Sequence, residues 1–444
     1  MGGSAFSYLE NPPYTPRMPP VVYEQAKVAC HAALRELFVY VATPIEGPAK
    51  ADHGDIDILV CQEKRLFFPK SEADATPKSH NELLNEVKLL LDAEFCKIVG
   101  PAANLAFRWP SSRGAEVTED EEGKKKYIQV DVRICKDVDQ FCWGLFKHAH
   151  GDLWNLLGST IRPFGLTVDE DALWIRIPEI ENHDRPRSKV MLTNNPVEIV
   201  HFLGMKVEGF WSEPFGSVEA LYDYATTCRL FWVKEERNDS CEEGAIGGEE
   251  GKTKLKSNDR KRMAYRAVFR RWIEEYIPQL RSEGRFRKPP GNSSGIRGLR
   301  AMVRDEAFEA FFIEPEYNHR LNDWRLQKNV EQVKRLIKDF IPKEDGEEHR
   351  DPIQYRSCLV SGMKKVILEN DTNFEAVVRP QFKDAEGFYD LDVVREFIVN
   401  NQKQVGEVAW GVALARAFES KERKRKAEAE AAVMAAKREI ALDN

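Results

Sequence analysis

The stretch HGDIDILVCQ, residues 53–62, places two aspartates on an otherwise apolar segment, and this alternation constrains how the chain can fold. Side chains on a strand point to opposite faces with a period of two, so Asp55 and Asp57 share one face and the isoleucines beside them share the other. Two carboxylates that lie close together repel each other unless a cation lies between them, and a divalent metal ion is the usual solution. The stretch therefore predicts half of a metal site.

A third aspartate occurs in a similar setting in QVDVRI, where Asp131 lies between apolar, β-branched neighbours. If both strands belong to one sheet, three carboxylates point to one place. Two-metal phosphoryl transfer needs such a cluster, because the ions activate the attacking hydroxyl, bridge the triphosphate and neutralise the leaving group. The three aspartates are therefore our candidate catalytic residues and ligands for Mg²⁺ or Mn²⁺.

The segments around these aspartates predict an α+β domain with a mixed sheet flanked by helices. An amphipathic helix is expected within residues 23–38, followed by a strand, a loop rich in Gly and Pro, and the strand of Asp57. Ser79 and Glu82 have the spacing of a capping box at the start of a second helix. Two strand-like pieces follow, and the second of them carries Asp131.

In this order, the segments VATPIEGPAKADHGDIDILV and YIQVDVRI resemble the DNA polymerase beta-like nucleotidyltransferase superfamily. Its hallmark is a helix, a strand ending in a Gly-Ser or Gly-Gly turn, a loop, a strand with two alternating aspartates, and an acidic residue on a later strand. The resemblance covers roughly residues 21–190. It implies that Asp55 and Asp57 bind both metal ions, and that Asp131 completes the catalytic metal site and helps to deprotonate an acceptor hydroxyl. The implied donor is a nucleoside triphosphate, with ATP as the default.

The chain departs from this superfamily at the Gly-Ser turn, which falls on Ala42 and Thr43. Under the resemblance, the Thr43 hydroxyl and Gly54 are the residues assigned to nucleotide binding. The altered turn supports an alternative, a non-catalytic protein that binds nucleic acid or a partner through the same fold. Retention of all three carboxylates speaks against it, because buried acids without a metal cost stability. A synthase that uses a small-molecule or nucleotide acceptor is a further alternative.

The chain of 444 residues is long enough for several domains. We expect an extended N-terminal arm at 1–20 and a nucleotidyltransferase catalytic domain at 21–190, whose sheet is closed by a hairpin from GLTVD and ALWIRI. A mainly helical domain with a basic segment is expected at 191–345, and a C-terminal helical region with a charged tail at 346–444. We expect the active site in the cleft between the catalytic and helical domains.

The basic segment Lys252–Lys288 contains 13 Lys and Arg against 4 Asp and Glu, a local net charge of +9 in a chain whose formal net charge is −7. Such a segment can neutralise the phosphates of a polyanion, so an RNA 3′-hydroxyl is the leading expected acceptor. The competing interpretation is that Arg270 and Arg271 pair with Glu274 and Glu275 one turn on.

Composition and targeting signals predict an intracellular protein, cytoplasmic or nuclear, without a membrane partner. The longest apolar runs are much shorter than the roughly 20 residues of a membrane span, and the start MGGSAFSYLENPPYTPRMPP lacks the features of a signal peptide. The run KERKRK is either a nuclear import signal or a charged helix surface. Eight cysteines without a C-x-x-C pair argue against zinc, and the spacing of His148 and His150 favours structural roles.

Overall fold

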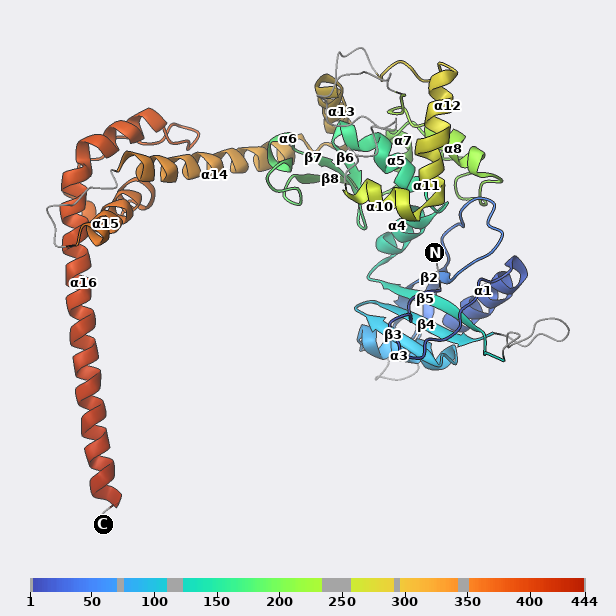
Figure 1. The fold of residues 1–444 in the computed structure, drawn as a ribbon, viewed down its shortest axis with the longest axis horizontal. Helices are drawn as coiled ribbons and strands as arrows, with labels where there is room; N and C mark the ends of the chain where they lie inside the picture. Colours follow the sequence, from blue (N-terminus) through green and yellow to red (C-terminus); the bar gives the residue numbers. More distant parts are fainter. Residues whose placement is uncertain are drawn as a thin grey trace. The chain divides into compact units, whose positions relative to one another are not determined.

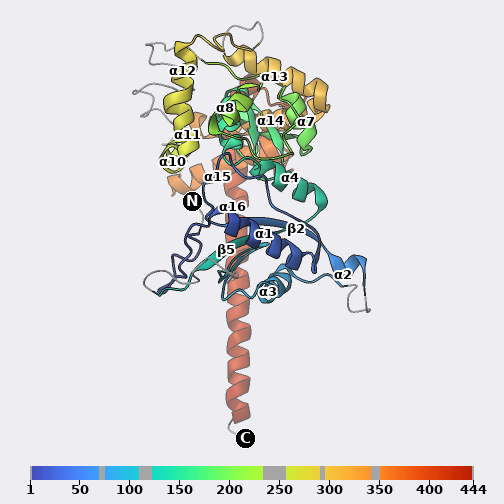
Figure 2. The ribbon, with the colours of Figure 1, turned by 90° about the vertical axis from the view of Figure 1, so that its right-hand side faces the viewer.

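A computed structural model of the chain describes residues 3–69, 76–109, 123–233, 257–290, 296–341 and 351–442 (Figure 1, Figure 2). The chain divides into two compact units, Met1–Pro315 and Glu316–Asn444, and each is considered by itself. The first unit combines helices with two sheets, and the second is helical. The predicted α+β class with a C-terminal helical region is therefore confirmed.

A five-stranded mixed sheet forms the centre of the N-terminal part of the first unit. Its strand order is β1-β2-β5-β4-β3. The strands are β1 (Phe38–Ala42), β2 (Ile56–Glu63), β3 (Phe95–Val99), β4 (Ala102–Arg108) and β5 (Tyr127–Cys135). β2 and β5 run parallel, whereas the other neighbours are antiparallel. The two strands that carry the predicted aspartates are therefore adjacent.

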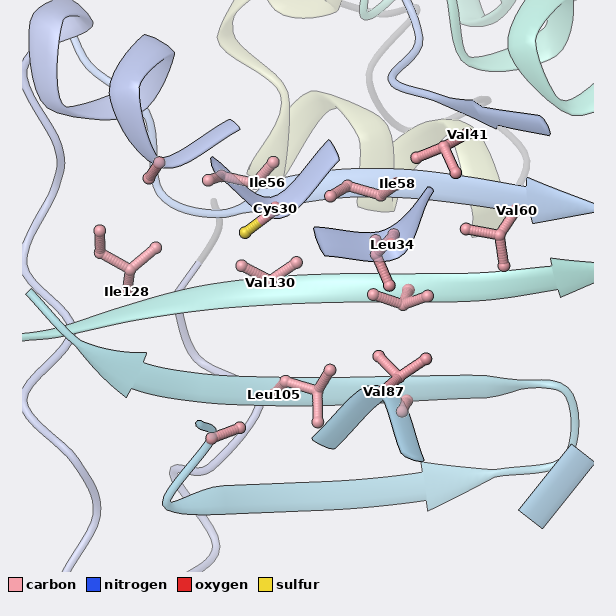
Figure 3. Packing of buried hydrophobic residues seen from close by; sticks show 14 of the residues in the cluster. Cys30, Leu34, Val41, Ile56, Ile58, Val60, Val87, Leu105, Ile128 and Val130 are labelled. Carbon is pink, nitrogen blue, oxygen red and sulfur yellow. The ribbon is translucent and has the colours of Figure 1, made fainter. Parts of the chain in front are cut away.

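Two helices, α1 (Pro20–Leu34) and α3 (His80–Leu90), cover one face of this sheet. Cys30 of α1 packs among the side chains of Ile56, Val130 and their neighbours, as Figure 3 shows. The Ser79 hydroxyl accepts a hydrogen bond from the backbone N–H of Glu82, and the Glu82 carboxylate accepts in return from the Ser79 backbone, so the predicted capping box is confirmed. This face is apolar along the length of the central strands.

The opposite face is apolar only at its two ends. At the end near the carboxyl termini of β2 and β5, Leu59, Cys61 and Cys135 pack under Phe141 of α4 (Val138–His148). At the other end, Phe6 of the N-terminal arm packs against Ala106 and Tyr127, with Phe95 beside them. The middle of this face is left for polar side chains.

The predicted hairpin forms, but it does not close the catalytic sheet, so that part of the prediction is wrong. β6 (Leu166–Val168) and β7 (Leu173–Arg176) pair with each other, and β8 (Lys189–Thr193) pairs with β7 to make a separate three-stranded sheet. Its apolar side chains are covered by α5 (Leu153–Ile161) and α13 (Ile296–Phe311), which contact β6 and β8 respectively. The small sheet therefore packs against these two helices.

Helices make up most of the remaining first unit. Asn195 caps α7 (Pro196–Phe202) by accepting from the backbone N–H of Val197. The others are the short α2 (Lys64–Phe67) and α6 (Pro178–Glu181), then α8 (Val218–Thr226), α10 (Ser257–Tyr265), α11 (Ala267–Arg271) and α12 (Ile277–Ser282). The predicted basic segment therefore occupies α10 to α12 and the residues after them, whereas Lys252, Lys254 and Lys256 lie outside the described residues.

The second unit is built from α14 (Glu314–Phe340), which begins at the boundary, α15 (Pro352–Lys364) and the long α16 (Leu391–Leu442). α14, α15 and the start of α16 share one apolar core. Asp390 caps α16 by accepting from the backbone N–H groups of Asp392 and Val393. The side chains at 414–431 are exposed, as expected for a charged tail. Among the residues described, no helix combines the length and apolarity that crossing a bilayer requires.

Candidate active site

The structure brings two of the predicted aspartates directly beside each other. Asp57 and Asp131 are register partners on the parallel strands β2 and β5, and Asp55 immediately precedes β2. Neighbouring strands lie about 4.8 Å apart, so these side chains emerge close together on the face opposite α1. The Asp57 side chain reaches solvent, but the protein packed around its carboxylate removes part of the hydration of that group; Asp55 and Asp131 are half-buried. The three carboxylates therefore form one acidic cluster at the surface of the sheet.

The electrostatics of the cluster favour a cation. Burial, followed by the nearby charges of Asp55 and Asp131, raises the pKa of Asp57 to about 6. Burial also raises the pKa of Asp55, and the charge of Asp131 adds to that effect. None of the three aspartates forms an ion pair with a side chain that the structure describes. Like charges held together without a counter-ion resist ionisation, and a bound cation relieves that cost.

Asp131 is held by amide side chains that the sequence analysis did not single out. Gln129 donates from Nε2 to Asp131 Oδ1 at 2.9 Å, and Asn104, the register partner of Asp131 on β4, also hydrogen-bonds to it. Burial raises the pKa of Asp131, whereas these two hydrogen bonds oppose the shift. Gln129 lies two residues before Asp131, so the period-two alternation that placed Asp57 beside Asp55 could also have found it.

Thr43 and Gly54, the residues assigned to nucleotide binding, have different surroundings. Thr43 follows the end of β1, and its hydroxyl hydrogen-bonds to His31 Nε2 of α1 at 2.8 Å. Because α1 packs on the face opposite Asp57, this contact directs the hydroxyl away from the carboxylates. Gly54 is buried, and a Cβ placed on Gly3 would lie 3.1 Å from its carbonyl oxygen. The described partner of the Thr43 hydroxyl is therefore His31 and not one of the three aspartates.

The loop between β1 and β2 carries a second polar group of side chains beside the cluster. Glu46 accepts from Lys50 Nζ at 2.5 Å and from the Tyr23 hydroxyl. The His53 ring stacks on the Tyr23 ring at 3.7 Å, and His53 Nδ1 is buried without a hydrogen-bond partner among the described residues. The Lys50 charge lowers the pKa of Asp55, so it is a cation that faces the cluster without pairing with it.

As they stand, no three His, Cys, Asp or Glu side chains within the described ranges are gathered closely enough to hold a metal ion. The donor set of the acidic cluster is nevertheless chemically suited to one, because hard divalent cations prefer carboxylate oxygens. Burial is the first cause of the three raised pKa values, and repulsion between the carboxylates adds to it for Asp55 and Asp57. The residues therefore fit Mg²⁺ or Mn²⁺ by their chemistry.

The two histidines after β5 have separate environments. His150 is fully buried, and its Nε2 bonds to the backbone oxygen of Phe210 at 2.7 Å, so it has a structural role as predicted. His148 is half-exposed and lies 3.7 Å from a carboxylate oxygen of Glu170. A positive charge on His148 would lower the pKa of Asp57, so this histidine lies near the edge of the cluster.

Several arginines of the predicted basic segment form ion pairs with acidic side chains. Arg262 pairs with Asp259 within α10 at 2.6 Å, and Arg266 pairs with Asp152 at 2.5 Å. Arg271 reaches Glu219 at 2.7 Å and Glu275 at 3.0 Å.

Other cations of the segment remain available to a ligand. Arg260, Lys261 and Arg270 are exposed and form no ion pair with a described side chain. The segment therefore contains both structural and unpaired cations.

Comparisons with family models and with curated proteins found no match for this chain. A function for this chain therefore has to be inferred from the geometry and chemistry of its own residues.

Proposed function

We propose that the chain is a metal-dependent nucleotidyltransferase that moves a nucleoside monophosphate from a nucleoside triphosphate, with ATP as the default donor, to an acceptor hydroxyl. The observation that carries the proposal is the acidic cluster. Asp57 and Asp131 are register partners on parallel strands, Asp55 precedes them on the same side, and all three have raised pKa values and no ion pair to a side chain in the described ranges.

The arrangement of elements around the cluster supports the nucleotidyltransferase fold. A helix, a strand, a loop and the strand of Asp57 follow one another along the chain, and the strand of Asp131 pairs beside it. The helices cover the opposite face of the sheet, and on the acidic face the Asp57 side chain reaches solvent. This is the order of elements in the superfamily that the sequence resembles.

In the proposed reaction, the acceptor oxygen bonds to the α-phosphorus of the donor while the bond from that phosphorus to the bridging β-phosphate oxygen breaks, which releases pyrophosphate. Two Mg²⁺ or Mn²⁺ ions, when bound, supply charge neutralisation for the triphosphate. Asp55 and Asp57 would hold both ions, and Asp131 would help to hold one of them. Asp131 also accepts the proton of the acceptor hydroxyl, a role that its raised pKa favours.

An RNA 3′-hydroxyl is the acceptor that the surface charges support best. Arg260, Lys261 and Arg270 provide exposed cations within the same unit as the acidic cluster. Cations of this kind bind the phosphates of a polyanion without reading its sequence. A small-molecule or nucleotide acceptor would need none of them.

A second candidate is a non-catalytic binding protein that keeps the nucleotidyltransferase fold. It is favoured by Thr43, whose hydroxyl is engaged by His31 rather than directed to the carboxylates. Under this candidate, the protein binds a nucleotide or nucleic acid but transfers nothing. A thermal-shift scan with Mn²⁺ and each nucleoside triphosphate detects binding under both candidates, so only transfer of label separates them.

The test is transfer of label from each α-³²P nucleoside triphosphate, with Mg²⁺ or Mn²⁺, to single-stranded RNA. We expect labelled RNA with ATP, and a loss of about 100- to 1,000-fold or more in Asp57→Asn, which removes charge without changing volume. Asp139→Asn, an exposed carboxylate on α4, is the matched control and should retain activity.

Nucleotide binding without transfer to any acceptor would favour the second candidate. Equal activity in Asp57→Asn and Asp139→Asn would remove the acidic cluster from the mechanism.

A further inference from the structure

The N-terminal arm, residues 3–19, is attached to the loop that leads into the acidic strand. Met18 and His53 form a two-way backbone bridge, with N–H to oxygen distances of 2.7 and 2.9 Å. Arg17 binds Asp52 twice, from Nε to the carboxylate at 2.5 Å and from Nη2 to the backbone oxygen at 3.1 Å. The end of the arm is therefore held beside the residues that precede Asp55.

The beginning of the arm is anchored independently by an apolar side chain. Phe6 is 3% exposed and packs against Ala106 and Tyr127, with its ring 5.9 Å from that of Phe95. Burying a phenylalanine side chain stabilises a contact by about 1.5–3 kcal/mol, so this anchor is strong for so short a segment. The start of the arm therefore packs on the acidic face of the sheet, at the end where β5 begins.

The start of the arm also approaches the backbone beside the aspartates. Gly3 has a φ of +83°, and a Cβ placed there would lie 3.1 Å from the Gly54 oxygen. Its own carbonyl accepts a hydrogen bond from the Thr15 hydroxyl at 2.5 Å. Glycine permits both the conformation and the close approach.

One contact joins the arm to Asp131 through Gln129. The backbone N–H of Ala5 donates to Gln129 Oε1 at 3.1 Å, and Gln129 Nε2 donates to Asp131 Oδ1 at 2.9 Å. An amide side chain can turn over and exchange its oxygen and nitrogen. The Ala5 N–H can only donate, so it selects the orientation in which the Gln129 oxygen faces the arm and the NH₂ group faces Asp131.

We propose that the N-terminal arm is a positioning element of the active site, in which Ala5 fixes the orientation of Gln129 and Gln129 fixes the carboxylate of Asp131 for metal binding. The proposal rests on the proposed function, because it assigns Asp131 to a metal site. Gln129 is 3% exposed, so water does not compete for its amide. Groups that orient a metal ligand commonly change metal affinity by about 10- to 100-fold when they are removed.

The turn at the start of the arm allows a substitution that removes only the N–H. The backbone N–H of Ser7 donates to the Ser4 oxygen at 3.2 Å, which makes Ala5 the second residue of a turn. Proline is favoured at that position, so Ala5→Pro deletes the donor while it keeps the local backbone. Ala5→Ser keeps the N–H and is the matched control. Gln129→Leu removes the amide itself.

The experiment measures Mn²⁺ affinity of the full chain from the signal of free Mn²⁺ in electron paramagnetic resonance, with urea unfolding to confirm that each variant is folded. We expect Ala5→Pro to weaken Mn²⁺ binding about tenfold and Gln129→Leu about 10- to 100-fold, with Ala5→Ser unchanged. The double variant should be no weaker than Gln129→Leu, because both changes break one relay.

The outcomes separate this inference from the proposed function. Wild-type Mn²⁺ affinity in a folded Ala5→Pro variant overturns the role of the arm but leaves the acidic cluster intact. Should Gln129→Leu prove unstable, Ala5→Pro decides once urea unfolding shows that it is folded, because Ala5 lies only at the edge of the Phe6 cluster. Absence of Mn²⁺ binding and of label transfer in the wild-type chain would overturn the proposed function and the inference together.

Discussion

The first unit contains two clusters of charged side chains that are partly removed from water, and they differ in how their charge is balanced. The acidic cluster of Asp55, Asp57 and Asp131 has like charges and no ion pair with a described side chain. The second cluster combines Arg176, Glu181 and Arg300 around the small sheet.

In the second cluster, the Arg176 guanidinium is almost completely buried and each of its nitrogens has a partner. Nε pairs with Glu181 at 2.7 Å, and Nη1 and Nη2 each donate at 2.8 Å to the backbone oxygens of Leu166 and Arg162. Arg300 Nη2 reaches the same glutamate at 2.8 Å, which ties α13 to the sheet. A network in which every charged group has a partner needs no ligand. The acidic cluster, by contrast, consists of like charges, and a bound cation would reduce their repulsion.

The largest expected effect on stability follows from unbalancing the second cluster. Arg176→Met should lower the free energy of unfolding by about 3–5 kcal/mol, because it leaves Glu181 buried with one partner fewer and two backbone oxygens without donors. Urea unfolding measures the change. Arg185→Met, an exposed position nearby, is the control and should stay within about 0.5 kcal/mol of wild type. A similar small effect in both would show that the network does not hold the small sheet.

Neutralising Asp57 of the acidic cluster should raise the free energy of unfolding near neutral pH, whereas Arg176→Met lowers it. The folded-state pKa of Asp57 is about 6, against 3.8 for the free side chain, so the folded protein retains a proton that the unfolded chain loses as pH rises between these values. The free energy of unfolding should therefore fall from about pH 4 to pH 6 and stay lower above that range.

In Asp57→Asn, the free energy of unfolding should fall much less over this pH range, so the variant should be more stable than wild type at pH 7. Urea unfolding at pH 4, 5, 6 and 7 checks the prediction, and added Mn²⁺ should stabilise wild type more than the variant. A variant that is less stable than wild type at pH 7 would mean that the carboxylate has a structural partner.

The smallest effects should separate two adjacent arginines of the basic segment. Arg271 is paired with Glu219 and Glu275, so Arg271→Gln should lower the melting temperature slightly and leave RNA affinity unchanged. Arg270 is exposed without an ion pair to a described side chain, so Arg270→Gln should leave stability unchanged.

In gel-shift titrations at two salt concentrations, Arg270→Gln should weaken RNA binding and reduce the salt slope by about one. If both variants bind RNA as wild type does, the basic segment stabilises the fold and does not bind RNA.

The alternation of polar and apolar residues allowed much of the acidic site to be predicted. It placed Asp55 and Asp57 on one face of a strand, and the same rule applies to Asp131. Gln129 obeys that rule too, but its role depends on the arm, and nothing in the local pattern indicates that Ala5 lies beside it. Thr43 was assigned by its place in a turn, whereas its partner His31 comes from a helix that packs on the other face.

The sequence by itself determined the local elements, because caps and alternation depend on residues a few positions apart. Ser79 with Glu82 and Asn195 with its helix are of this kind. Only the tertiary structure decided that Asp57 and Asp131 are register partners, that the β6–β7 hairpin joins β8 in a separate sheet, and that Arg271 is paired with acids. These features depend on contacts between distant segments, whose energies come from packing and charge in the folded chain and leave no short-range pattern.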